Sequence, residues 1–133
     1  EQNGVNYPTV AGILMLGRAS AIQRFVPTGK SSFQVLEGTN VRVNEDYALP
    51  ILAAIEKIIA HMEVWNPQQE LEFGLFRMAV PEFDKRALRE AIVNAFCHRD
   101  YSIMGRVRVA IVGGRAEARW SGRKDRERNR QNL

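Results

Sequence analysis

The sequence predicts an α+β fold in which helices are layered on a mixed sheet. Short runs of alternating apolar and polar residues end at glycines, and longer segments carry apolar residues at helical spacing. These segments follow one another as strand, helix, strand, helix, strand, helix, strand, strand, an order that favours helices packed on one sheet. The length of 133 residues and the hydrophobic content of 45% suit one domain, or one small domain followed by the beginning of another.

The amino-terminal quarter is predicted to hold two strands separated by a short helix. Residues 9–17 are almost entirely apolar and end at a glycine, which is typical of a buried strand. Ser20 is suited to cap a short helix that ends at Arg24 or Phe25. Residues 31–37 alternate in polarity and precede a glycine, which predicts the second strand.

The strongest helical pattern covers residues 46–64. Asn44 or Asp46 can cap this helix, and Pro50 then falls in its first turn, where the missing N–H does little harm. The apolar residues at helical spacing are Ala48, Ile51, Leu52, Ile55, Ile58, Ile59 and Met62. We expect this helix to cover the sheet.

The carboxy-terminal half is predicted to form a strand, a helix and a hairpin. Residues 71–80 alternate as a third strand, and Asp84 can cap a helix that runs to about His98. Alternating apolar residues on both sides of a Gly-Gly pair predict a hairpin over residues 106–120. Its turn is placed at Gly113-Gly114, because two glycines tolerate the positive φ angles of a tight two-residue turn.

The positive charge is concentrated at the carboxyl end. Residues 123–133 carry five basic and two acidic residues, a net of +3, so the preceding 122 residues contribute only +1 of the total of +4. We expect the tail to be disordered, and a nearly neutral body does not predict a phosphate-binding surface of its own. No apolar run approaches the length of a membrane span, no signal peptide is recognised, and Cys97 has no second cysteine to pair with, so a cytoplasmic location is expected.

The predicted helix 84–98 holds the candidate chemistry. At 100° per residue its apolar stripe is formed by Leu88, Ala91, Ile92 and Ala95, and Glu90 and Asn94 fall on the opposite side, one turn apart. A carboxylate can accept a proton from an attacking water, and an amide oxygen can bind a magnesium ion that bridges phosphates. The alternative interpretation is an ordinary solvated helix face.

A longer string around these residues resembles a known family. Residues 87–102 read ALREAIVNAFCHRDYS, a string similar to a signature of transcriptional regulators related to the ATP-dependent DNA helicase RecG. That family resembles an AlbA/Schlafen-type DNA-binding domain joined through a connecting module to a divergent ATPase domain of the gyrase/Hsp90/histidine-kinase/MutL (GHKL) class. Residues 8–17, PTVAGILMLG, and 24–27, RFVP, are similar to the connecting module, and the resemblance covers residues 7–122.

The resemblance implies roles, cofactors and a division of the chain. It assigns Glu90 as the water-activating base and Asn94 as the ligand of Mg and ATP, while His98, Arg99 and Asp100 match the string without an assigned role. An alternative for those three is a helix end where His98 and Arg99 complement the dipole. Residues 1–82 would be a connecting α+β module, 83–122 the truncated start of a GHKL-like ATP-binding domain, and 123–133 a basic tail.

One departure from the family limits these expectations. After the hairpin the family usually shows an Asn-Pro-Gly-Gly-like turn of the nucleotide pocket, but here the charged tail follows. We therefore expect ATP and Mg to belong to the full-length context, with neither bound tightly by this fragment and no hydrolysis by it. DNA would be contacted through a domain absent here. The alternative function is a protein–protein interaction or dimerisation module, a homo-oligomer with a degenerate nucleotide site.

Overall fold

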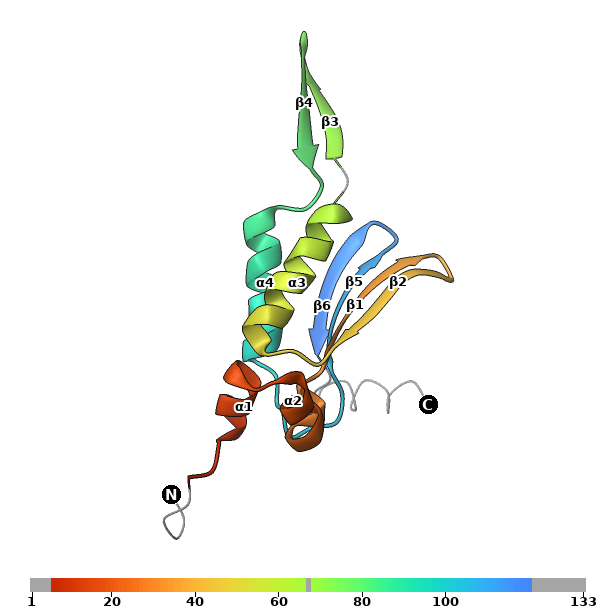
Figure 1. The fold of residues 1–133 in the computed structure, drawn as a ribbon. Coiled ribbons are helices and arrows are strands. Elements are labelled where there is room, and N and C mark those ends of the chain that lie inside the picture. The colour runs from red at the N-terminus through yellow and green to blue at the C-terminus, as the bar shows by residue number, and fades with distance from the viewer. Residues whose placement is uncertain (1–5, 67, 121–133) are drawn as a thin grey trace, which may run out of the picture.

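The computed structural model of the chain describes residues 6–66 and 68–120 (Figure 1). Two short helices open the chain, strand pairs and longer helices follow, and a hairpin ends the described part. In order, the elements are α1 (Val10–Leu16), α2 (Ala19–Phe25), the 3-10 turn η1 (Pro27–Gly29), β1 (Ser31–Glu37), β2 (Asn40–Tyr47), α3 (Ile51–Val64), β3 (Gln68–Phe73), β4 (Phe76–Pro81), α4 (Lys85–Cys97), β5 (Val107–Val112) and β6 (Arg115–Trp120). The α+β class is confirmed.

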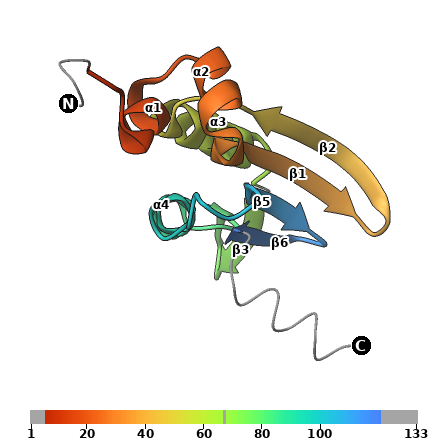
Figure 2. The same cartoon turned by 90° about the horizontal axis from the view of Figure 1, so that it is seen from below.

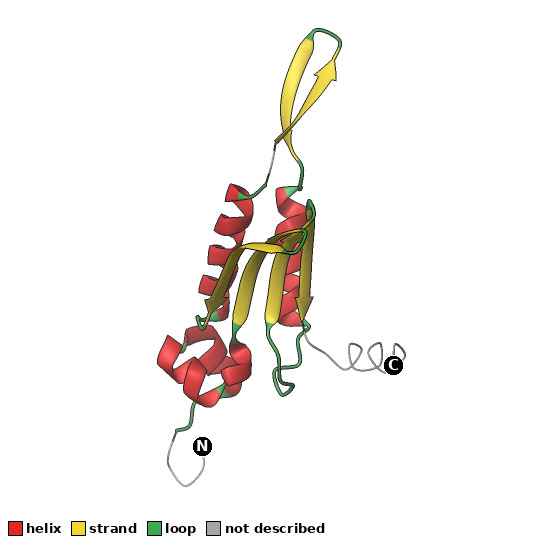
Figure 3. Cartoon of the chain, turned by 90° about the vertical axis from the view of Figure 1, so that its right-hand side faces the viewer, coloured by secondary structure: helices red, strands yellow, loops and turns green. Residues whose placement is uncertain are grey.

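The body of the molecule is a four-stranded sheet with α3 and α4 on one face (Figures 2 and 3). The strand order is β2-β1-β5-β6, with antiparallel hairpins on both sides and a parallel pairing of β1 with β5 at the centre. The sheet is therefore mixed, as predicted.

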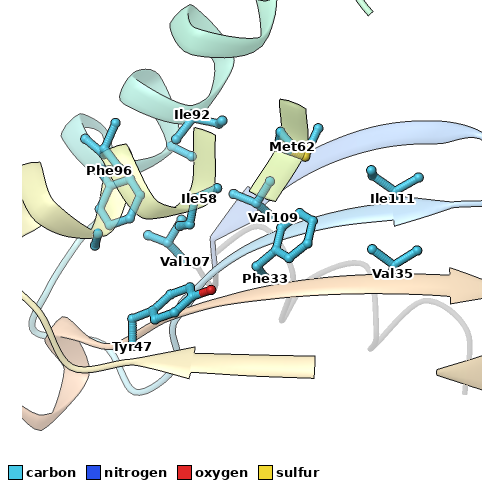
Figure 4. Packing of buried hydrophobic residues seen from close by; sticks show 13 residues of the cluster. Phe33, Val35, Tyr47, Ile58, Met62, Ile92, Phe96, Val107, Val109 and Ile111 are labelled. Atoms are coloured by element: carbon cyan, nitrogen blue, oxygen red, sulfur yellow. The ribbon is translucent and has the colours of Figure 1, made fainter. Parts of the chain in front are cut away.

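The core fills the space between the sheet and the two long helices (Figure 4). Alternate residues of β1 and β5 point into it, among them Phe33, Val35, Val107 and Val109, because successive strand side chains face opposite sides. The helices contribute Ile58, Met62, Ile92 and Phe96. Sheet pairing and core both cross the predicted boundary between residues 82 and 83.

A second, smaller apolar cluster joins α1 and α2 to the body. Ile13 and Leu14 of α1 pack on Ile22 and Val26. Gly29 packs directly against this cluster and has no room for a side chain, since a Cβ on it would lie 2.6 Å from Cδ2 of Leu14. The two short helices thus pack against each other and lie below the first turn of α3 in Figure 1.

The predicted strand over residues 9–17 is wrong, because Val10–Leu16 forms the helix α1. Oγ1 of Thr9 accepts a hydrogen bond from the backbone N–H of Gly12 at 3.0 Å, which is the geometry of a helix N-cap. A short, uniformly apolar run has no period that separates strand from helix. The next helix, α2, is confirmed, but its N-cap is Arg18 rather than Ser20.

The predicted helix over residues 46–64 begins five residues later, at Ile51. Asn44 and Asp46 do not cap it; they belong to the strand β2, which the sequence analysis missed. Pro50 stands at the N-cap with extended backbone angles. Its ring also disfavours helical geometry at the preceding residue, so the helix starts only after it.

The predicted strand over residues 71–80 is two strands, β3 and β4, which form a separate hairpin. Its turn lies at Gly74, whose φ of 61° favours glycine. The side chain of Asn66 closes the base of the hairpin: Nδ2 donates to the carbonyl of Phe83 at 2.9 Å, and Oδ1 accepts from the N–H of Phe83 at 3.0 Å. The predicted element order is therefore wrong at three places: the helix α1, the strand β2 and the hairpin β3–β4.

The remaining predictions concern β1 and the carboxyl end. The strand β1 and the β5–β6 hairpin are confirmed, with φ angles of 53° and 78° at Gly113 and Gly114. The tail over residues 123–133 lies outside the described residues. None of the helices in the described part of the chain has the length and apolar character needed to cross a bilayer.

Candidate functional site

The helix α4 is fixed at its start by a cap and along its length by the core. Oδ1 of Asp84 accepts a hydrogen bond from the N–H of Ala87 at 2.8 Å, as predicted for an N-cap. Ile92 and Ala95 are buried. Leu88 packs against the core while partly exposed, whereas Ala91 is exposed, so the predicted stripe is wrong at Ala91.

Glu90 and Asn94 lie on the solvent-exposed side of α4, one helical turn apart. Neither side chain forms a hydrogen bond or an ion pair with another described residue. The backbone carbonyl of Asn94 accepts the N–H of His98 at 3.0 Å and so ends the helix. A carboxylate and an amide are therefore held side by side on a rigid element, with their oxygens available to an external group.

Two hollows flank this pair without including it. A groove of about 500 Å³ between α1, α3 and α4 is lined by Arg89 and Val93, and an open hollow between α4 and the start of β6 is lined by Ala87 and Ala91. At 100° per residue Glu90 and Asn94 fall between these two sets, on a ridge. In the described part of the chain, no three His, Cys, Asp or Glu side chains gather as a metal site.

Arg99 is buried and joins two distant parts of the backbone. Nη1 donates to the carbonyl of Lys30 at 3.2 Å and Nη2 to the carbonyl of Gly105 at 2.7 Å. The guanidinium lies over the ring of Tyr101, 5.0 Å from its centroid. Burial lowers the pKa of Arg99, which Tyr101 and Asp100 partly offset. Arg99 thus ties the loop after α4 to the start of β1, and its two hydrogen bonds do not go to the end of α4.

The rest of the motif builds the same loop. Oδ1 of Asp100 accepts hydrogen bonds from the N–H of Ser102 at 2.9 Å and from its hydroxyl at 2.6 Å. The hydroxyl of Tyr101 donates to the carbonyl of Phe96 at 3.0 Å, and burial raises its pKa. His98 is exposed at the C-cap of α4. The residues 98–102 therefore fix the path from α4 into β5, and Asn94 and Glu90 lie about one and two turns before His98.

A polar cluster between β2 and α3 was not predicted from the sequence. The hydroxyl of Tyr47 donates to Oε2 of Glu45 at 2.8 Å, and Nε2 of His61 lies 3.4 Å from the same oxygen. The His61 ring stacks on Phe33 with 5.3 Å between centroids. Burial, together with the bond to Glu45, raises the pKa of Tyr47 well above its usual range. Only the strand β2 brings Glu45 and Tyr47 onto the side of α3, and that strand was not predicted.

Comparisons with known proteins give one informative similarity. No protein-family model matches the sequence, and no curated protein matches it. The chain is similar to the crystal structure of the DIP2311 protein from Corynebacterium diphtheriae, with a TM-score of 0.54 and 23% sequence identity. The similarity covers 63% of this chain and 18% of that one, so this chain spans less than a fifth of the length of that protein. At this identity the likeness concerns the fold alone.

Proposed function

We propose that the chain is part of a DNA-associated transcriptional regulator or helicase-related protein, and that α4 contributes the base and the metal ligand of a nucleotide site. The observation that carries the proposal is the pair Glu90 and Asn94, which is exposed, one turn apart and uncommitted to other described residues. The string around the pair, with its resemblance to GHKL-type regulators, supports the same assignment.

The two side chains fit a metal–nucleotide complex in part. Asn94 would bind a Mg²⁺ ion through its amide oxygen, and Glu90 would orient a water by accepting a hydrogen bond from it and would take its proton as the water attacks. Bound Mg-ATP supplies the phosphates and their metal. No described hollow includes the pair, so contacts to the base and most phosphate contacts would come from outside the described residues.

Arg99 is not available as a phosphate ligand in this arrangement. Its two terminal nitrogens are bound to the carbonyls of Lys30 and Gly105, and its side chain is buried. Transferring it to a phosphate would break both bonds. The proposed chemistry therefore depends on Glu90 and Asn94, and Arg99 acts on it only by fixing the loop that follows α4.

A backbone-amide NMR titration of the 133-residue chain with Mg-ATP tests the proposal. A partial site in open solvent should bind with a dissociation constant of about 1 mM or weaker, which corresponds to about 4 kcal/mol of binding free energy. The shift changes should be confined to the exposed side of α4 and should require Mg²⁺. Asn94→Ala should abolish them.

A matched control removes an exposed helical amide elsewhere. Gln23 lies exposed on α2, and Gln23→Ala should leave the titration unchanged. Shift changes that persist in Asn94→Ala and disappear with added salt would reduce the interaction to charge attraction and contradict the assignment. Micromolar binding that Asn94→Ala abolishes would show instead that the site is complete within this chain.

A further inference from the structure

The hairpin β3–β4 presents an apolar face that nothing in the described chain covers. The antiparallel register places Leu71 opposite Met78 and Phe73 opposite Phe76, so these four side chains share one face. The hairpin projects away from the sheet and the long helices (Figures 1 and 3), and none of its residues belongs to either buried core cluster. The face is therefore presented to solvent.

The exposure of this face is large for so short an element. Phe73 is 66% exposed and Phe76 76%, Leu71 and Met78 are 42% and 55% exposed, and Leu75 at the tip is fully exposed. With about 200 Å² for each side chain of this size, the patch amounts to roughly 650 Å². That exceeds the roughly 300–600 Å² of the largest apolar patch on a typical monomer, and patches of that size mark interaction sites. A two-stranded hairpin alone is also only marginally stable in water.

The other face of the hairpin is charged. Glu70, Glu72 and Arg77 lie there, and Nε of Arg77 pairs with Oε1 of Glu72 at 2.9 Å. The hairpin is thus amphipathic, with a net charge of −1 that sits entirely on one side. An anionic lipid surface or a nucleic acid would be recognised by basic residues instead. The chemistry favours a protein surface that is itself apolar and uncharged.

We propose that this face packs against the same face of a second copy of the chain, forming a two-fold dimer through the hairpin. A two-fold contact needs a self-complementary patch, and a face without charge meets its own copy without repulsion. Two such patches would bury up to about 1,300 Å² in total, near the lower limit of specific, stable interfaces. The dimer is accordingly weak, and it forms independently of the proposed nucleotide site.

The base of the hairpin suits this role. The two hydrogen bonds between Asn66 and the backbone of Phe83 hold the strands together where they leave the body. Nζ of Lys85 also pairs with Oε1 of Glu63 at 3.0 Å beside this point. These interactions fix where the hairpin leaves the body, which lowers the entropy lost when two copies associate.

Sedimentation equilibrium of the 133-residue chain, combined with hydrogen–deuterium exchange, tests the proposal. The wild type should dimerise, and amides of residues 68–81 should become protected as the concentration rises. Met78→Lys places a charge in the contact on both copies and should weaken the dimer about 100-fold or more. The control Ala79→Lys adds the same charge to the neighbouring exposed position on the opposite face and should leave the dimer unchanged.

Each other result overturns the proposal. Dimerisation that Met78→Lys leaves intact would place the contact elsewhere on the chain. A monomer at all concentrations with fast-exchanging hairpin amides would mean that the face has a different partner. Binding of the chain to neutral lipid vesicles that Met78→Lys abolishes would identify that partner as a bilayer surface. Because the hairpin lies outside both core clusters, neither substitution should disturb the core. An unchanged circular dichroism spectrum would confirm that each variant folds.

Discussion

Replacing Arg99 by methionine removes the guanidinium and keeps an unbranched stem in the buried space. Two charge-assisted hydrogen bonds are lost, and each contributes about 1.5–3 kcal/mol to stability. Three effects reduce the total. The carbonyl of Lys30 keeps a second donor, the N–H of Val107 at 3.3 Å, and methionine carries no charge that must be desolvated. Nε of Arg99, buried without a hydrogen-bond partner among the described residues, is removed as well. We therefore expect Arg99→Met to lower the free energy of unfolding by about 2–3 kcal/mol.

Guanidinium unfolding at pH 7, followed by circular dichroism, measures this difference. Arg99→Lys should recover only part of this loss, because an ammonium group on a flexible stem does not reproduce a fork that spans two carbonyls. Arg89→Met, at an exposed position of α4, is the control and should stay within about 0.5 kcal/mol of the wild type. A loss for Arg99→Met as small as that of the control would refute the structural role.

Two further predictions concern Tyr47 and Asn66. The pKa of Tyr47 is raised in the folded state, so its protonated form stabilises the fold fully below about pH 10, the usual tyrosine pKa, and this contribution is lost as the pH rises above it. Guanidinium midpoints at pH 8 and pH 11 should fall less for Tyr47→Phe than for the wild type; an equal fall would contradict the cause given for the shift. Asn66→Ala removes both hydrogen bonds to Phe83 and should lower the free energy of unfolding by about 1–2 kcal/mol. Amide exchange, measured at low protein concentration, should become faster in β3 and β4 than in β5. An equal increase in amide exchange in β3–β4 and in β5 would show that these two hydrogen bonds support the whole fold.

The sequence predicted best those elements whose local chemistry marks a start or a turn. Asp84 caps α4, and Gly113-Gly114 sets the turn of the last hairpin, so both were placed correctly. The run Val10–Leu16 has no period to decide between helix and strand. In residues 71–80 the apolar alternation changes phase at Gly74, from Leu71 and Phe73 to Phe76 and Met78, and this change marks two strands where one was predicted.

The candidate site was predictable to a similar extent. The exposure of Glu90 and Asn94 follows from helical spacing alone, because their helix is amphipathic and correctly bounded. The role of Arg99 could not be predicted in this way. One of its partners, the carbonyl of Lys30, is 69 residues distant in the sequence and is brought near only by the pairing of β1 with β5.

The parallel pairing at the centre of the sheet also has a kinetic consequence. β1 can form a hairpin with β2 as soon as both exist, since only a short turn separates them. Its other edge must wait for β5, whose first paired residue, Val107, follows Ser31 by 76 positions. Closing so long a loop before its contacts stabilise it makes folding slow, and the backbone groups of β1 that pair with β5 stay open on a strand edge in the meantime. The interval between synthesis of β1 and arrival of β5 is when this chain is most exposed to aggregation.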